Sequence, residues 1–517
     1  MTSNAVVTPH YESADAARTI LEAGGNAVDA AVAAVAVQGV VAPETCGIGG
    51  DLFALIHAPG WDLPRCLNSS GRAGSGVSSE ALRSAGHDTI PGDHPAAVTI
   101  PGCVDGMETL INDLGALSLA QVLAPAITLA RDGFEVSTEQ ANAFGRQASV
   151  YSANPAVRDF YPEGKPVSRS DRVTRPDLAT TLEYVAEGGR ESFYGGRPGE
   201  DISDAVGGLI TLVDMETPIA EWVDPIGVPV AGLIGWTTPP NTQGYLGPGT
   251  LAVFEMLDPP DDPEDPAWWH LLIEAYRCLA WEREDVVSDP DHVSLPADLL
   301  LNRDRLARAA GSVERETAGT WPDRVGALAG TAYLCVADSS GMAVSVIQSN
   351  YRGTGSPFGA ARSGFLLQDR GLGFTLTPGH PNELGPGKRP LHTLSPTLWS
   401  DGSGPRWILG TRGGAVQPQL IAQVGARAIL GGTPFSDAQG APRWTVSDFG
   451  PHSAPRLAAE PDTPSGVRDG LIARGHEVVT TEGPQPGWGP VSIIELEGDQ
   501  RRAAADPRVD TTAALVF

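Results

Sequence analysis

Residues 330–350 read GTAYLCVADSSGMAVSVIQSN and carry a clear strand signal. Its two halves, TAYLCVAD and MAVSVIQS, are rich in alternating and β-branched residues, and Ser339-Ser340-Gly341 between them is typical of a turn. We therefore expect a β-hairpin here. Shorter, mostly apolar runs predict further strands at Leu52–His57, Gly364–Gln368, Leu394–Leu398 and Trp407–Leu409.

Helical patterns flank this strand-rich centre on both sides. Ser13 is a suitable cap for a helix over residues 14–23, which Gly24 and Gly25 end. Residues 60–100 are rich in Ser, Gly and Pro and predict a loop. Further helices are expected at Ala27–Ala42, Met107–Asp113, Ser118–Arg131, Leu178–Glu187 and Trp268–Trp281. Helices before and after a group of strands predict a layered α+β architecture.

Composition excludes several classes of function. The chain has 517 residues, 41% of them hydrophobic, with 35 basic against 63 acidic side chains and a net charge of -28. A large core can form, but such a charge argues against nucleic acid or an anionic membrane as partner. The five cysteines lack CxxC spacing, so they predict neither a disulfide framework nor a zinc site.

No segment predicts export or membrane insertion. Residues 1–10 lack the basic start and apolar core of a secretory signal. The apolar stretch at 27–42 is interrupted by Asp29 and Gln38 and is shorter than the ~20 residues that a bilayer span needs. We expect a cytoplasmic protein in which this stretch forms a buried helix.

Thr331 stands at the start of a predicted strand, directly after a loop that ends in Gly330. A threonine hydroxyl is a weak nucleophile unless a base lies beside it, and a free α-amino group on the same residue can be that base. Such an amine has an ordinary pKa near 7.7–8.0 and accepts a proton close to neutral pH. Cleavage before Thr331 would create both groups at once. The alternative is an ordinary strand threonine.

Gly413 and Gly414 follow the predicted strand at 407–410. Consecutive glycines allow the backbone to approach a substrate and to direct N–H groups at a developing oxyanion. The alternative is a simple turn.

Seven segments in the chain are informative together: ILEAGGNAVDAAVAAVAV (Ile20–Val37), CGIGGDLF (Cys46–Phe53), IPGCVDG (Ile100–Gly106), APAITLARDGF (Ala124–Phe134), GTAYLCVADSSGMAVSVIQSN (Gly330–Asn350), PGKRPLHTLSPTL (Pro386–Leu398) and GTRGGAVQPQ (Gly410–Gln419). In order and coverage they resemble the γ-glutamyltransferase family of N-terminal-nucleophile hydrolases. An inactive relative that kept the fold is the alternative.

The resemblance implies a four-layer αββα sandwich and a precursor that cleaves itself before Thr331. The products would be a large chain (1–330) and a small chain (331–517), which together form one domain and a heterodimer; a dimer of such heterodimers stays open. No metal or organic cofactor is implied.

The resemblance also implies roles for individual residues. Thr331 matches the nucleophile, and Gly413 with Gly414 matches the oxyanion pair. Ser349 falls where the family has a hydroxyl that binds the nucleophile's amino group. Arg72 matches the arginine that binds the α-carboxylate of a γ-glutamyl donor, a geometry that suits a guanidinium.

Two departures from the family pattern concern the donor's polar groups. Leu372 and Gly373 stand where glutathione-type members carry an acidic residue for the α-amino group. His392 and Thr393 replace the paired serines of the carboxylate pocket, and both are candidate substrate-binding residues.

Other departures leave the substrate pocket undefined. Either Asn350 or Tyr351 replaces the family's substrate-binding asparagine. Asp369 and Arg370 form either part of the recognition site, with Arg370 contacting a carboxylate, or a surface ion pair. The stretch 374–390 is short where other members fold a lid, which predicts an open pocket.

The sequence predicts a γ-glutamyltransferase/hydrolase-like amidohydrolase that forms an acyl-threonine intermediate and passes the acyl group to water or an amine. The alternative substrate is a glutaryl amide, as in the cephalosporin-acylase-like branch, because the acidic contact for an α-amino group is missing. A nucleotide-binding oxidoreductase is disfavoured, since Gly47–Gly50 lack GxGxxG spacing. A non-catalytic binding protein would differ by failing to cleave itself.

Overall fold

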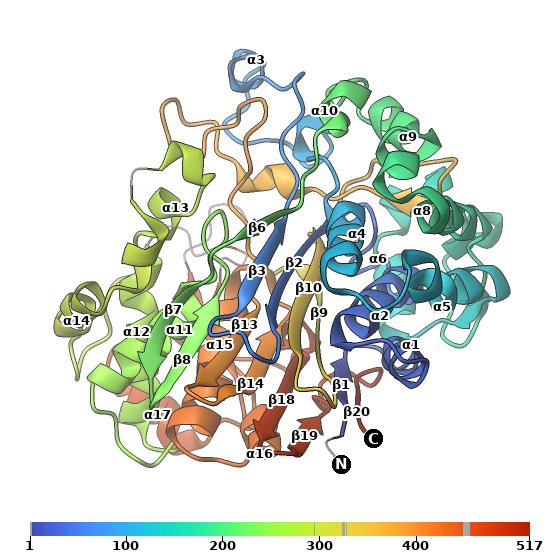
Figure 1. Cartoon of the computed structure of the whole chain (residues 1–517). Helices are drawn as coiled ribbons and strands as arrows, with labels where there is room; N and C mark the ends of the chain where they lie inside the picture. The colour runs from blue at the N-terminus through green and yellow to red at the C-terminus, as the bar shows by residue number, and fades with distance from the viewer. Residues whose placement is uncertain (1–2, 294, 323–325, 327, 448–454) are drawn as a thin grey trace.

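Two antiparallel β-sheets lie face to face between two layers of helices in the computed structural model (Figure 1). The structure describes residues 3–293, 295–322, 326, 328–447 and 455–517. The order of layers is helix, sheet, sheet, helix, so the predicted α+β class and the αββα sandwich are confirmed.

The first sheet has the predicted hairpin at its centre. Residues 330–337 and 343–351 pair antiparallel, and Gly341 turns the chain between them with a φ of +98°. In spatial order the seven strands are β20 (Ala513–Val516), β1 (Ala5–Thr8), β9 (Gly330–Ala337), β10 (Ala343–Tyr351), β2 (Asp51–His57), β3 (Arg65–Ser69) and β6 (Glu221–Val223).

The second sheet also combines strands from before and after residue 330. Its six strands, in spatial order, are β19 (Gln500–Ala504), β18 (Val491–Glu497), β14 (Gly404–Thr411), β13 (Thr397–Asp401), β8 (Leu233–Thr237) and β7 (Ile226–Val230). Each sheet is therefore shared between the two halves of the chain that flank Thr331.

Alternation along β9 divides its side chains between two cores. Tyr333 and Cys335 enter the core between the sheets, whereas Leu334 and Val336 pack against the first helical layer. Both faces of this central strand are covered, so both sets of positions are apolar.

The first helical layer contains α1 (Tyr11–Glu22), α2 (Ala27–Val41), α4 (Cys103–Leu114), α5 (Leu119–Asp132) and α8 (Pro176–Tyr194). The predicted buried helix is α2: all of its residues are buried, and Asn26 caps it in a reciprocal pair with Asp29. Among the described residues, no helix is both long and apolar enough to cross a membrane.

The second helical layer contains α11 (Leu246–Met256), α12 (Pro266–Ala280), α14 (Arg303–Gly311), α15 (Gln417–Gly425) and α17 (Ser465–Ala473). The shorter helices are α3 (Ser79–Ser84), α6 (Thr138–Arg146), α7 (Ala148–Tyr151), α9 (Arg197–Ala205), α10 (Leu212–Glu216), α13 (Arg283–Val286) and α16 (Phe435–Gly440). Short strands outside the two large sheets are β4 (Phe134–Glu135), β5 (Arg172–Val173), β11 (Gly359–Ala360), β12 (Phe365–Leu366), β15 (Trp444–Ser447), β16 (Arg456–Ala459) and β17 (Val478–Thr480).

The structure corrects local predictions at several points. The first helix begins at Tyr11 with His10 as its cap, so Ser13 lies inside the helix and does not cap it. The predicted loop at 60–100 contains β3 and α3, because residues 65–69 bury themselves by pairing with β2. The strand expected at 394–398 begins at Thr397 instead. Pro396 has no N–H to give to a ladder, so pairing with Leu409 starts only after it.

Candidate active site

Three oxygen atoms meet where β9 begins. The Thr331 hydroxyl Oγ1 lies 2.6 Å from the carbonyl oxygen of Gly330 and 3.3 Å from Ser349 Oγ. Ser349 donates its own proton to the same carbonyl oxygen over 2.8 Å. The pairing of β9 with β10 is irregular between Gln348 and Tyr351, and Ser349 lies at this irregularity. The sequence-predicted pair Thr331 and Ser349 is thus brought together.

Gly330 is packed tightly against a neighbouring loop. A Cβ atom at this position would lie 2.6 Å from Gly353 Cα and 2.8 Å from Gly353 N. Backbone atoms cannot move aside as the end of a side chain can, so any other residue at 330 would displace the carbonyl group. The geometry beside Thr331 therefore depends on a glycine before it.

Ser349 Oγ also accepts two hydrogen bonds. The backbone N–H of Tyr351 donates over 2.8 Å, and Arg370 Nη2 donates over 3.3 Å. Tyr351 has a φ of +76°, in the left-handed region that non-glycine residues seldom adopt. Such positions are frequent at functional sites.

Arg370 is a fully buried cation beside these hydroxyls. Its Nη1 donates to Thr393 Oγ1 over 3.1 Å, and its guanidinium stacks 4.1 Å from the centre of the Tyr351 ring. Its Nε has no hydrogen-bond partner, and it forms no ion pair with any carboxylate of the described residues. Burial lowers the pKa of Arg370, an effect that Tyr351, Asp51 and Asp369 oppose.

The alternative of a surface ion pair between Asp369 and Arg370 is wrong. Both residues are buried, and Asp369 Oδ1 instead accepts the backbone N–H of Arg352 over 3.0 Å. Burial raises the pKa of the Asp369 carboxyl to about 6. The charge of Arg370 is therefore directed toward Ser349 and Thr393.

Gly413 and Gly414 follow β14 with φ angles of +131° and +60°. Neither of their N–H groups donates a hydrogen bond to another described residue. The carbonyl oxygen of Gly414 accepts from the side chain of Gln243 over 3.2 Å. Consecutive backbone N–H groups in a turn of this kind can bind an anion, which is the role predicted for this pair from the sequence.

Arg72 lies in a separate ion pair. Its Nη1 donates to Asp289 Oδ2 and to the carbonyl oxygen of Gly387, both over 3.0 Å. Its side chain is 34% exposed. No hydrogen bond or ion pair between described residues joins it to Thr331 or Arg370.

His392 uses both ring nitrogens within the protein. Its Nδ1 accepts the backbone N–H of Leu394 over 3.3 Å, so the proton is on Nε2, which donates to Asp51 Oδ2 over 3.0 Å. Both side chains are fully buried. Burial and the charge of Arg370 lower the pKa of His392 to about 3, against the opposing effect of Asp51. A neutral imidazole with no free nitrogen holds the segment that carries Thr393.

Asp51 is a site residue that the sequence analysis did not single out. Its Oδ1 accepts from Gly71 N and from Gln368 Nε2, each over 2.9 Å. The available signal was its place inside CGIGGDLF, where a carboxylate enters a buried strand directly after a glycine turn. Such a carboxylate needs a partner, and the partner is His392.

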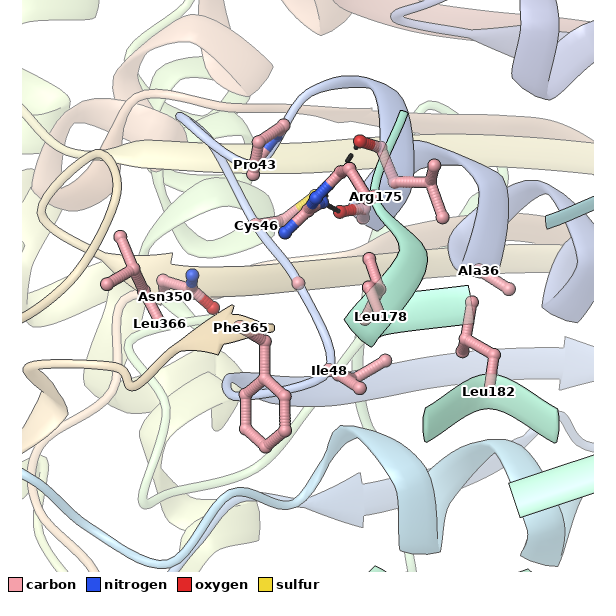
Figure 2. A pocket seen from close by; sticks show the side chains of 13 residues that line it. Ala36, Pro43, Cys46, Ile48, Arg175, Leu178, Leu182, Asn350, Phe365 and Leu366 are labelled. Carbon is pink, nitrogen blue, oxygen red and sulfur yellow. Dashed lines mark hydrogen bonds between the residues drawn. The ribbon is translucent and has the colours of Figure 1, made fainter. Parts of the chain in front are cut away.

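Asn350 points away from this cluster. Its Nδ2 donates to the carbonyl oxygen of Thr354 over 3.1 Å, and its side chain lines a cavity of about 10 Å³ together with Cys46 and Arg175 (Figure 2). This volume is enough for about one water molecule. Between the two candidates from the sequence, Tyr351 is therefore the one that lies next to Arg370.

In the uncut chain the predicted open pocket does not expose the described residues of the site. Thr331 is 1% exposed, and Ser349, Arg370 and Thr393 are equally buried. The carbonyl group of Gly330 takes up the space beside both hydroxyls, because the chain is continuous through residue 331.

A second group of polar side chains, far from Thr331 in sequence, offers atoms that could bind a metal. Ligand atoms of His270, Glu274 and His476 lie within 4.8 Å of one another. His270 Nε2 donates to the carbonyl oxygen of Glu314, so His270 Nδ1 accepts from His476 Nε2 over 2.8 Å. Arg277 Nε donates to Glu274 over 2.5 Å. These hydrogen bonds join the side chains to one another and to the protein backbone. We therefore interpret the group as a packing contact between α12 and the segment that follows α17.

Comparisons with known proteins agree with this geometry. The family model described as gamma-glutamyltranspeptidase matches residues 13–516. The chain is 33% identical over 524 residues to a glutathione hydrolase-like proenzyme of Bacillus subtilis, with 99% of this chain and 98% of that protein covered. It is 32% identical over 524 residues to an oxamate amidohydrolase proenzyme of Klebsiella pneumoniae, with the same coverage of 99% and 98%. A crystal structure of cephalosporin acylase from Bacillus halodurans superposes with a TM-score of 0.91 at 31% identity and covers 100% of this chain and 96% of that one.

Proposed function

Because the chain belongs to the gamma-glutamyltranspeptidase family, we propose that it is a self-processing amidohydrolase whose nucleophile is Thr331. The observation that carries this proposal is the meeting of the Thr331 hydroxyl, the Ser349 hydroxyl and the Gly330 carbonyl within 3.3 Å. Proenzyme names among the relatives support the same reaction.

In the first step Thr331 Oγ1 attacks the carbonyl carbon of Gly330. That carbon lies at most about 3.8 Å away, since a C=O bond adds about 1.23 Å to the 2.6 Å between the oxygens. The Gly330–Thr331 peptide bond becomes an ester, and the released nitrogen takes up the hydroxyl proton. Water then hydrolyses the ester, leaving a carboxylate on Gly330 and a free amine on Thr331. Ser349 polarises the carbonyl through its 2.8 Å hydrogen bond.

The products of this step are the chains 1–330 and 331–517. We propose that they stay together as one heterodimeric domain. In the first sheet β1 of the large chain lies between β20 and β9 of the small chain, and the β9–β10 hairpin lies between β1 and β2. Separation would break both sheets and the core between them.

In turnover the new amine of Thr331 accepts the proton of its own hydroxyl, and the oxygen attacks the amide carbon of a substrate. The N–H groups of Gly413 and Gly414 bind the oxyanion. The amine leaving group departs with the proton, and water or another amine releases the acyl group from Thr331.

The acyl group carries a carboxylate in this proposal. An unpaired guanidinium buried beside the nucleophile is costly, and an anionic substrate would supply the missing partner. Arg370 with Thr393 is therefore the carboxylate anchor, and Arg72 is a further anchor only if it leaves Asp289. Oxamate, the compound named for the Klebsiella pneumoniae relative, is a small amide of this class.

Two acyl groups fit this description. A γ-glutamyl group is the one that the family name suggests, whereas a glutaryl-type group has the carboxylate without the α-amino group. The second is favoured by Arg370, because an ammonium close to a buried guanidinium is repelled at low dielectric. His392, fixed on Asp51, offers no acceptor to such an ammonium.

The test compares three p-nitroanilides on the processed protein: γ-glutamyl, glutaryl and an uncharged butyryl control. The proposal predicts hydrolysis of the two carboxylate-bearing amides, with glutaryl at the higher kcat/KM, and little reaction with butyryl. Equal rates on all three would refute the carboxylate anchor. A chain that neither cleaves itself nor hydrolyses any amide would be a non-catalytic relative.

A further inference from the structure

The side chain of Gln243 joins two parts of the site that lie far apart in sequence. It is fully buried, in the segment that follows β8. Its Nε2 lies 3.2 Å from the carbonyl oxygen of Thr393, 3.2 Å from that of Gly414 and 3.3 Å from that of Ala415. Two amide hydrogens are thus shared among three carbonyl groups.

Arg283 fixes the orientation of this amide. Its Nε donates to Gln243 Oε1 over 2.7 Å, and its guanidinium is held in turn by Glu284. With the oxygen of the amide committed to an arginine, the nitrogen must face the carbonyl groups. A rotation by half a turn would break every one of these contacts.

The two segments that Gln243 connects have different tasks in the proposed reaction. Thr393 holds Arg370, the proposed carboxylate anchor. Gly414 belongs to the proposed oxyanion turn, which has no side chain on either glycine to fix its position. The separation of these segments decides whether a substrate can reach both of them at once.

We propose that Gln243 is a positioning residue that sets this separation and thereby the orientation of the Gly413 and Gly414 N–H groups. This inference rests on the proposed function. Gln243 contacts backbone carbonyl groups and Arg283, so it acts through the turn and not on the substrate.

The contacts that would promote self-cleavage do not involve the turn that Gln243 positions. In the uncut chain the carbonyl oxygen of Gly330 accepts from the hydroxyls of Thr331 and Ser349. It accepts nothing from the N–H groups of Gly413 or Gly414 among the described residues. Loss of Gln243 should therefore impair turnover and leave self-cleavage nearly unchanged.

The experiment uses two variants of the full chain. Gln243→Met keeps the volume and removes both the donors and the acceptor. Gln243→Glu keeps the shape and the acceptor for Arg283 but removes the amide donors. The matched control is Gln423→Met: Gln423 is also buried, and its Nε2 donates to the carbonyl oxygens of Gln419 over 3.0 Å and Trp444 over 2.8 Å. Its contacts lie between α15 and β15, away from the turn.

Each protein is assayed for the fraction cleaved at Thr331 and for kcat and KM with glutaryl p-nitroanilide per processed chain. We expect both Gln243 variants to be cleaved like the wild type and to lose about 100-fold in kcat with KM changed less than threefold. Gln423→Met should lose thermal stability and keep its kcat.

Unchanged kcat in both Gln243 variants would overturn the inference, as would an equal loss in Gln423→Met. Failure of both Gln243 variants to be cleaved would also overturn it, because the residue would then serve the fold as a whole. An inactive wild type would instead refute the proposed function, and the inference with it.

Discussion

Arg370 Nη2 donates to Ser349 Oγ over 3.3 Å, and Ser349 Oγ lies 3.3 Å from Thr331 Oγ1. The proposed nucleophile is thus separated from a buried guanidinium by a single hydroxyl group. This chain of contacts connects the start of β9, the irregular end of β10 and the segment after β12. In the proposed function it is the part of the site that would distinguish a carboxylate-bearing substrate from a neutral one.

Replacing Arg370 by Met should reduce kcat/KM for carboxylate-bearing amides roughly 10- to 150-fold, the equivalent of about 1.5–3 kcal/mol for a hydrogen bond to a charged group. Kinetics on glutaryl and butyryl p-nitroanilides measure the effect. The butyryl rate should not fall in parallel.

Arg72→Ala is the matched comparison for that variant. Because Arg72 is held by Asp289 and Gly387, its removal should change kcat/KM less than the removal of Arg370. If Arg72→Ala lowered kcat/KM more than Arg370→Met, Arg72 would be the residue that binds the carboxylate, as the family resemblance implies.

Gly330→Ala should slow self-cleavage strongly. The new Cβ would lie 2.6 Å from Gly353 Cα, so the Gly330 carbonyl must move away from the two hydroxyls that contact it. Denaturing gel electrophoresis over time follows the appearance of the small chain. Leu328→Ala, at a position 42% exposed, is the control and should be cleaved at the wild-type rate. If Gly330→Ala were cleaved at the wild-type rate, the position of the Gly330 carbonyl group would not be critical for self-cleavage.

The cleaved chains should migrate as one species under native conditions. Each of the two large sheets contains strands from both chains, and the core between them has residues from both. Size-exclusion chromatography of the processed protein, followed by denaturing electrophoresis of the peak, tests this expectation. Elution of the two chains in separate peaks would contradict it.

Glu44 provides a prediction on pH and stability. Burial and the neighbouring Glu139 raise the pKa of its carboxyl to about 8, against the opposing effect of Arg412. The folded state therefore keeps a proton that the unfolded state loses near pH 4.5, so this contribution to stability is complete below pH 4.5 and is lost as the pH rises through 8.

Glu44→Gln is uncharged at every pH and should remove that loss. We expect its Tm to match the wild type at pH 5 and to exceed it at pH 9, as measured by differential scanning calorimetry. An identical difference in Tm at both pH values would mean that Glu44 is not protonated in the folded state.

The hairpin, the capped helix α2 and the layered fold could be predicted from the sequence because their signals are local. Alternation, capping residues and turn residues act over a few positions. The closeness of Ser349 to Thr331 was implied by the family resemblance and not by a local pattern. The apolar residues at 394–398 predict a strand over the whole range, but Pro396 has no N–H for the ladder and pairing begins at Thr397.

The rest of the site depends on pairings across the whole chain. Asp51 and His392 are 341 residues apart, and Gln243 reaches Gly414 across 171. No local pattern marks such partners. The sequence therefore predicts His392 as a substrate-binding candidate, whereas in the structure both of its ring nitrogens bind other groups of the protein. The burial of Arg370 was equally hidden, since its charge by itself predicts exposure.

In the proposed function, Thr331 becomes the N-terminus of a separate chain and acts as its nucleophile. The most direct measurement is intact mass spectrometry of the purified protein with N-terminal sequencing of every chain, on the wild type and on Thr331→Ala. We expect two wild-type chains, the smaller one beginning at Thr331, and a single inactive chain of 517 residues for Thr331→Ala. A wild type that stays uncut after prolonged incubation, or a Thr331→Ala protein that is cleaved and active, would contradict it.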